Sequence, residues 1–427
     1  MASASKKKEG KADAPRPCEV EAEIGRLDGR VHGRLATSLK PKERIASCGL
    51  ERLAMRLCCR TSYRNACDFL NDALHRRGGA RLAASTLSEH ASAQGEAVLG
   101  EQRRMARGIL EANGVSWESG LPAEEGGLPE DVVRPVPETP AMESPAVKTA
   151  IADYNGNRPA REQIRDAGLI SKTELSPDDC VYVSLDDVGV KHQKESRTAD
   201  GKAKKAATVE NTVVHVQHAG KDYLLTAVGM FEAMRLLLAF LLANGLLKGK
   251  RLIFFSDGAQ NIRAALERHF AFYPYELLLD WYHLEKRMTE LLSMALRGDK
   301  GRRREMRREL DGILWAGNVE EAMDYLRTLG PECVKNRERL DDAVAYLERK
   351  RPYVCCYALR AQLKYRNSSN PAEKANDLVV AQRQKHNGMS WSFRGSGALA
   401  AMSALIRNGE ADAWIQRGTI AFNFYAA

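Results

Sequence analysis

The sequence has no apolar run long enough to cross a membrane and no cysteine pattern typical of a metal finger. Its most apolar stretch, 230–247, is interrupted by Glu232 and Arg235, whereas a membrane span needs about 18 consecutive apolar residues. The nine cysteines include no CxxC, which argues against zinc fingers and against a secreted disulfide framework. The N-terminal lysines are not followed by an apolar segment, so we expect no signal peptide and a cytoplasmic protein.

Charge of either sign is not scarce, but the balance is basic. The 65 Lys and Arg residues exceed the 56 Asp and Glu residues, which gives a formal net charge of +9. This excess suits a protein that contacts a polyanion such as nucleic acid, although a solvated basic surface without a partner explains it equally well. A chain of 427 residues is long enough for two or three domains.

Composition divides the chain into consecutive regions. The predicted regions are a disordered basic tail at 1–20, an all-helical domain at 21–112, a linker at 113–149 and an α/β domain at 150–427. The linker is rich in proline and in acidic residues, so it buries too little apolar surface to fold alone. Within the last region, residues from about 298 to 365 show only helical patterns, which predicts an all-helical insertion.

Short β-branched and apolar runs predict a five-stranded sheet in the last region. The expected strands are 180–188, 212–217, 223–228, 251–256 and 275–279. Helices are expected at 231–247 and 258–270, from 281 onward, and from 371 to about 385. The order β-β-β-α-β-α-β-α is the order of ribonuclease H-like folds, so the predicted fold class is α/β with a mixed sheet.

Carboxylates follow two of the predicted buried strands. Asp186 lies near the end of the first strand, and Asp257 follows the fourth, in a segment where Gly258 permits a sharp turn. Phosphodiester cleavage by two metals needs carboxylates that converge on one point, and Mg²⁺ prefers such oxygen ligands. An aspartate at a strand end can equally be a turn residue or a helix N-cap. Glu373, one turn into the last helix, is the third candidate, although a glutamate there also suits the helix dipole.

Four motif-like segments follow one another in the last region. They are Leu185–Gln193, Ser256–Ala259, Leu279–Lys286 and Asn370–Asp377, followed by Arg383–Ser392. Together they resemble the catalytic region of bacterial insertion-sequence DDE transposases related to the Mutator class. The resemblance covers roughly 150–427 and implies a ribonuclease H-like catalytic domain. It also implies a Mg²⁺- or Mn²⁺-dependent enzyme that cuts and joins double-stranded DNA, both terminal inverted repeats and target DNA, as a homo-oligomer near the bacterial nucleoid.

The resemblance assigns roles to particular residues. Asp186 is similar to the first metal ligand, with the adjacent Asp187 as the competing choice, and Asp257 and Glu373 are similar to the second and third. Asp280 and His283 match an acidic residue, two further residues and a histidine after the fifth strand. The histidine then donates to the scissile phosphate or steadies a ligand; a buried histidine bonded to a backbone carbonyl is the structural alternative.

Two further segments are candidates for DNA contact. Helical patterns on either side of Gly78-Gly79 resemble a helix-turn-helix, in which a second helix enters the major groove. The base-reading candidates are Ser85, Thr86, Ser88, His90 and Gln94. Arg302, Arg303 and Arg304 form a basic run suited to phosphate contacts. A helical hairpin used for dimerisation and a solvated insertion face are the respective alternatives.

Two other functions are compatible with these features. A former transposase kept as a DNA-binding protein shares the basic segments and the helix-turn-helix but needs no metal. A ribonuclease H-like nuclease that cuts RNA or branched DNA shares the carboxylates but joins no strands. The N-terminal helical domain and the helical insertion favour a transposase over such a nuclease.

Overall fold

The computed structural model describes most of the chain from residue 48 onward. The described residues are 20–22, 25–27, 48–73, 82–123, 128, 132–134, 145–165, 179–193, 208–386 and 389–424. The predicted tail at 1–20 lies almost entirely outside them, as does the Gly78-Gly79 turn. Among the described residues, no helix combines the length and apolar character that a bilayer crossing requires.

A mixed five-stranded sheet forms the centre of the fold, as the sequence predicts. Its strands are β3 (Cys180–Lys191), β4 (Thr208–His218), β5 (Lys221–Val228), β6 (Arg251–Ser256) and β7 (Tyr275–Leu279). Their order in space is β5-β4-β3-β6-β7. The first three pair antiparallel and the last two run parallel to β3. Ala219 and Gly220, both with positive φ, close the β4–β5 hairpin as a two-residue turn.

Each face of the sheet carries its own core because side chains alternate along a strand. On β3, Val181, Val183 and Leu185 belong to the larger core. Cys180 and Tyr182 belong to a second core on the opposite face. The central strand is therefore buried on both sides, which explains its nearly continuous apolar sequence.

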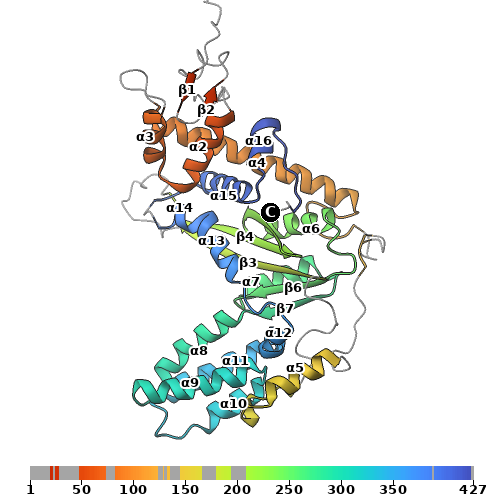
Figure 1. The fold of residues 1–427 in the computed structure, drawn as a ribbon, viewed down its shortest axis with the longest axis vertical. Helices are drawn as coiled ribbons and strands as arrows, with labels where there is room; N and C mark the ends of the chain where they lie inside the picture. Colours follow the sequence, from red (N-terminus) through yellow and green to blue (C-terminus); the bar gives the residue numbers. More distant parts are fainter. Residues whose placement is uncertain are drawn as a thin grey trace, which may run out of the picture.

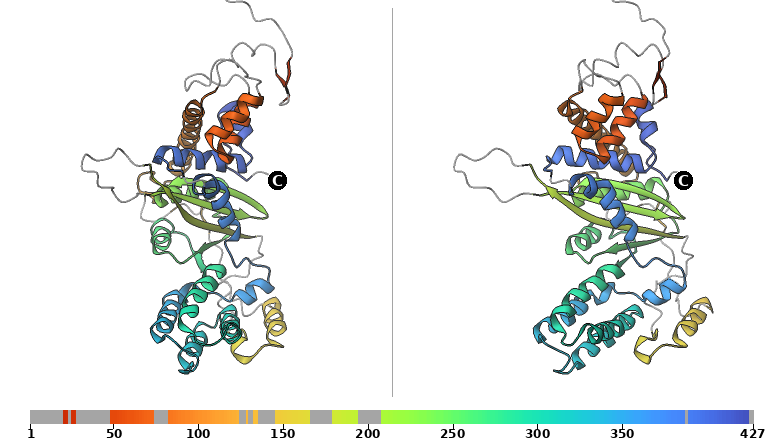
Figure 2. Two further views of the ribbon diagram at one scale, coloured as in Figure 1. Left: turned by 90° about the vertical axis from the view of Figure 1, so that its left-hand side faces the viewer. Right: turned by 60° about the vertical axis from the view of Figure 1, so that its left-hand side comes forward.

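The larger core lies between the sheet and helices from both ends of the chain. Helix α6 (Met230–Ala243) and helix α15 (Phe393–Arg407) pack on β5, and α4 (Ala84–Ala112) packs on α15 and α6. Figure 1 and both views of Figure 2 show α15 between the sheet and the N-terminal helices. Helices α2 (Cys48–Arg60) and α3 (Tyr63–Ala73) share this core. Residues 48–112 are thus joined to the sheet by continuous packing.

The second core joins the other face of the sheet to a helical subdomain (Figure 1). Helix α8 (Trp281–Ala295) leads away from the sheet. It is followed by α9 (Lys300–Trp315), α10 (Val319–Thr328), α11 (Arg337–Lys350), the 3-10 turn η6 (Arg351–Tyr353) and α12 (Tyr357–Gln362). This succession occupies the region predicted to be an all-helical insertion. Helix α5 (Pro145–Asn155) packs on α12, and the 3-10 turn η3 (Ala160–Glu162) packs on α9.

The chain returns to the sheet through one helical segment with a wide middle turn. It comprises α13 (Asn370–Asn376), a π-helical turn η7 (Asp377–Ala381) and α14 (Gln382–Gln384). Helix α13 packs on β3 and β4, and η7 packs on α15. A short final helix, α16 (Ala411–Arg417), packs on α2. The predicted helix from 371 to about 385 is therefore present, with a π turn inside it, a feature that is common at functional sites.

Two parts differ from the sequence expectations. Residues Val20–Ala22 (β1) and Gly25–Leu27 (β2) pair as antiparallel strands within the region predicted to be all-helical. Charged and apolar residues alternate there with a period of two, which is a strand pattern. In the predicted linker at 113–149, Val115 and Val133 are buried, and the backbone of Arg134 pairs with Leu247 and Gly249. These described linker residues pack on the body of the protein.

Candidate active site

Asp186 and Asp257 lie level with each other on neighbouring parallel strands. The register pairs Ser184 of β3 with Phe255 of β6, and each aspartate comes two residues later in its own strand direction. Alternation then directs both side chains to the face that carries α8 and α13. Asp257 is fixed locally because its Oδ1 accepts a hydrogen bond from the backbone N–H of Ala259 at 2.8 Å.

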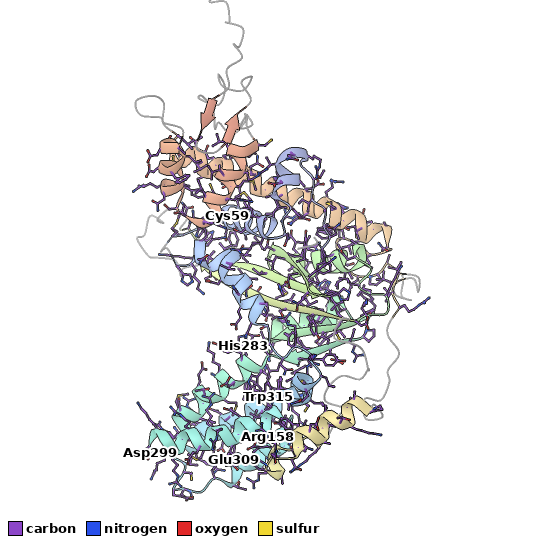
Figure 3. The ribbon with its side chains drawn as sticks, viewed as in Figure 1. Cys59, Arg158, His283, Asp299, Glu309 and Trp315 are labelled. Carbon is purple, nitrogen blue, oxygen red and sulfur yellow. The ribbon has the colours of Figure 1, made fainter. Side chains whose placement is uncertain are left out.

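Glu373 and His283 approach the two aspartates from two helices. Glu373 is on α13 and His283 is in the first turn of α8, and their Oε1 and Nε2 atoms are 3.0 Å apart. Figure 3 shows His283 at the end of α8 that adjoins the sheet. The four side chains line one recess, here called the carboxylate recess. Its lining is Ser184, Leu185, Asp186, Phe255, Ser256, Asp257, His283, Ser369, Ala372, Glu373 and Asn376.

The recess concentrates negative charge that the protein only partly offsets. Burial and the nearby Asp257 carboxylate raise the pKa of Asp186, even though part of its side chain reaches solvent. Asn376 opposes this shift, because its Nδ2 donates to Asp186 Oδ2 at 2.6 Å. Asn376 is buried one helical turn after Glu373. It was not identified from the sequence; its only signal is the i, i+3 spacing from Glu373.

Asp280 connects the helices that carry His283 and Glu373. Its side chain is fully buried, and its Oδ1 accepts from the backbone N–H of His283 at 3.2 Å as the N-cap of α8. Its Oδ2 accepts from the backbone N–H of Ser369, the residue that precedes α13. The Asp280 backbone N–H donates to Ser256 O at 2.9 Å, next to Asp257. Asp280 therefore positions the recess without lining it.

Asp187, the competing first ligand, points to the opposite face of the sheet. Its Oδ1 accepts from Thr212 Oγ1 at 2.5 Å, and its Oδ2 accepts from Nδ2 of Asn261 at 3.0 Å. Asn261 belongs to α7 (Gln260–His269), which packs on α6. The structure thus brings Asp186, and not Asp187, together with Asp257 and Glu373.

The donor set suits a hard cation, although the side chains do not converge on one point. Within the parts of the chain that the structure describes, no three His, Cys, Asp or Glu side chains are grouped closely enough to hold a metal ion. Glu373 is turned toward His283 instead. Carboxylate oxygens are nevertheless the ligands that Mg²⁺ prefers, and the repulsion between Asp186 and Asp257 is the kind that a cation relieves.

The base-reading candidates divide into two groups on α4. Ser85, Thr86 and Ser88 lie in its first turns with exposed or half-buried side chains. His90 is buried, and burial lowers its pKa. Gln94 donates to Glu51 Oε1 at 2.9 Å and accepts from Trp414 Nε1 at 3.2 Å. In this arrangement His90 and Gln94 contribute to packing between helices, and only the first three can reach a ligand.

The basic run of the insertion lies away from the carboxylate recess. Arg302, Arg303 and Arg304 are in the first turns of α9, which begins near the end of α8 opposite to His283. Figure 3 shows Asp299 and His283 at opposite ends of the α8–α9 region. Arg302 and Arg304 are exposed. The structure thus leaves two of these side chains accessible, but not beside the carboxylates.

Comparison of the sequence with models of known protein families and with curated proteins gives no match.

Proposed function

We propose that this protein is a DDE-type transposase that cuts and joins double-stranded DNA at the carboxylate recess, with Mg²⁺ or Mn²⁺ as cofactor. One observation carries the proposal: Asp186, Asp257 and Glu373, which are far apart in the sequence, line the same recess. The mixed sheet, with three antiparallel strands followed by two parallel ones, is compatible with a ribonuclease H-like fold.

Asp186, Asp257 and Glu373 would hold the metal ions, whose chemistry is to activate an attacking oxygen and to stabilise the leaving oxygen of a phosphodiester. The chain's own groups prepare this site. The backbone N–H of Ala259 fixes Asp257, and Asn376 orients the Asp186 carboxylate. His283 holds Glu373 through Nε2, and this nitrogen would be free to donate to a substrate phosphate if Glu373 served as a metal ligand.

The partners proposed here are the terminal inverted repeats and target DNA, bound by a homo-oligomer. Transposition needs two DNA ends to be held together, so we expect at least two protein copies on paired ends. The base-reading role is kept for Ser85, Thr86 and Ser88, whose side chains are accessible on α4. Sedimentation of the protein on paired ends would contradict this expectation if it gave one copy per pair.

A DNA-binding protein without catalytic activity is the second candidate. The observation in its favour is that Glu373 pairs with His283, and no three-residue metal cluster is in place among the described residues. Such a protein would bind the repeats equally well with and without divalent cations. Its carboxylate substitutions would leave every measurable property of the DNA complex unchanged.

The test is cleavage of DNA that carries the inverted repeats flanking the gene, in Mg²⁺ and in EDTA. The intact protein is compared with Asp186→Ala, Asp257→Ala and Glu373→Ala, and with Asp187→Ala as the matched control on the other face of β3. We expect metal-dependent cleavage that the first three substitutions abolish while DNA binding remains. Tight binding without cleavage by the intact protein would favour the second candidate.

A further inference from the structure

A second recess, here called the arginine recess, lies between the N-terminal helices and the segment that follows Glu373. It is a cavity of about 300 Å³. Arg56, Cys59 and Arg60 of α2 line one side, and Leu378 of η7 lies opposite; Ser403 and Arg407 of α15 complete it. Figure 3 shows Cys59 between the N-terminal helices and the sheet.

Among the residues that the structure describes, the three arginines of this recess have no acidic partner. Arg56 and Arg60 are one helical turn apart on α2, a spacing at which like charges repel each other. Within the described part of the chain, no carboxylate forms an ion pair with Arg56, Arg60 or Arg407. Burial, and then the charge of Arg60, lower the pKa of Arg407. An anion in the recess would relieve this repulsion.

A buried hydroxyl lies beside the arginines. Ser403 is 4% exposed, and its hydroxyl is a hydrogen-bond partner of the Cys59 thiol. The neighbouring Cys59 adds no negative charge, since burial raises the pKa of its thiol to about 11. The recess therefore combines three cations with no carboxylate among its lining residues, a composition that favours the binding of a phosphate.

The arginine recess is connected to the carboxylate recess through one helical segment. Leu378 follows Glu373 by little more than one turn, about 7–8 Å along a helix axis. Arg407 Nη2 donates to the carbonyl oxygen of Leu378 at 3.3 Å, so α15 is tied to the π turn.

We propose that the arginine recess binds a backbone phosphate of the same DNA strand whose phosphodiester enters the carboxylate recess. The inference rests on the proposed function and adds a phosphate contact from α2 and α15. The contact fixes how far the strand advances along α13, and therefore which phosphodiester reaches Asp186 and Asp257. It reads no base sequence, because a phosphate carries none.

The test is the salt dependence of duplex DNA binding, measured by fluorescence anisotropy in EDTA so that no cleavage occurs. Arg60→Gln and Arg407→Gln are compared with Arg417→Gln, an exposed arginine on α16 that lies outside the recess. Each recess substitution should reduce the slope of log K against log salt by about 0.9 and weaken binding roughly three- to tenfold near 0.1 M salt. Arg60→Lys, which keeps the charge, should retain the slope.

Equal slopes and affinities for the recess variants and Arg417→Gln would overturn the proposal. A recess that binds only free anions would also overturn it. In that case inorganic phosphate would raise the melting temperature of the wild type but not that of Arg60→Gln, and the two proteins would bind duplex DNA with equal affinity. The proposed function is judged separately by cleavage in Mg²⁺. If the intact protein cleaves DNA but the recess variants bind DNA like Arg417→Gln, only the proposal for the arginine recess is refuted. If the recess variants change the salt dependence of binding but the intact protein does not cleave DNA, only the proposed enzymatic function is refuted.

Discussion

Replacing Asp280 by alanine should lower the free energy of unfolding. It should also reduce DNA cleavage by more than this loss of stability explains. The buried carboxylate accepts one backbone N–H from His283 and another from Ser369. Both donors lose their partner in Asp280→Ala. Because Ser369 precedes α13, the helix that carries Glu373 loses one of its attachments to the sheet edge.

The size of the effect follows from these two contacts. A hydrogen bond to a charged acceptor contributes about 1.5–3 kcal/mol, so two of them amount to roughly 3–6 kcal/mol. Removing a buried charge also removes its desolvation penalty, which offsets part of the loss, so we expect a net loss of about 2–4 kcal/mol. Unfolding in urea measures this change directly.

Asp299→Ala is the matched control for Asp280→Ala. Asp299 also caps a helix, since its Oδ1 accepts from the backbone N–H of Arg302 at 2.8 Å, but it is exposed and lies far from the recess. The control should lose only about 1 kcal/mol, as N-cap substitutions do, and should cleave DNA normally. Equal losses of stability in the two variants, with normal cleavage by Asp280→Ala, would refute the positioning role.

Three further predictions concern packing, ionisation and the recess. Gly95→Ala should lose about 1–3 kcal/mol of stability, because its Cβ would overlap the backbone of α15. Gly100→Ala, on the same helix, has open space around its Cβ and should be neutral or stabilising. Urea unfolding of the two variants tests the difference. Glu410 is fully buried, and burial raises its pKa from 4.5 to about 7. Because the folded protein holds this proton more tightly than the unfolded chain, stability should fall by up to about 3 kcal/mol as the pH rises from about 4.5 to about 7. Glu410→Gln should remove this dependence in melts at pH 5 and 8; an unchanged dependence would contradict the assignment. Asn376→Leu removes a hydrogen bond to the Asp186 carboxylate, which contributes about 1.5–3 kcal/mol, and should slow single-turnover cleavage roughly 10- to 150-fold. Cleavage by Asn376→Leu at the wild-type rate would exclude a role for Asn376 in orienting Asp186.

The sheet was predictable because its strands are short, apolar and rich in β-branched residues. The run from Cys180 to Val188 shows this most clearly. The same property hid which of Asp186 and Asp187 faces Asp257. A strand buried on both faces has no alternation of apolar and polar residues, so its sequence does not reveal which face each side chain occupies. That information comes from the helices, α8 on one face and α7 on the other.

The long helix α4 shows where local signals mislead. Its polar first part, from Ala84 to Gln94, resembles the second helix of a helix-turn-helix. The helix instead continues to Ala112, because Gly95 permits close packing on Ala398 of α15. His90 is buried beside Glu51 of α2, with 4.0 Å between its Nε2 and Glu51 Oε1. Contacts between residues so distant in sequence outweigh helix propensity, and local patterns do not contain them.

Asn376 and Asp280 illustrate the same limit within the candidate site. Neither an asparagine one turn after a glutamate nor an aspartate before a helix is unusual in sequence. Their roles arise only when α13 is placed across the end of β3 and beside β7. The resemblance indicated the three carboxylates, Asp280 and His283 beforehand, whereas the contact of Asn376 with Asp186 and the backbone contacts of Asp280 could not be predicted from the sequence.

A change in the metal preference of one carboxylate shows whether these side chains form a metal site that acts on DNA. Asp257→Cys replaces a hard oxygen ligand by a softer sulfur, which Mg²⁺ binds poorly and Mn²⁺ accepts more readily. We expect this variant to cleave DNA in Mn²⁺ but not in Mg²⁺, while the wild type is active in both. Full activity of Asp257→Cys in Mg²⁺, or wild-type cleavage that persists in EDTA, would contradict it.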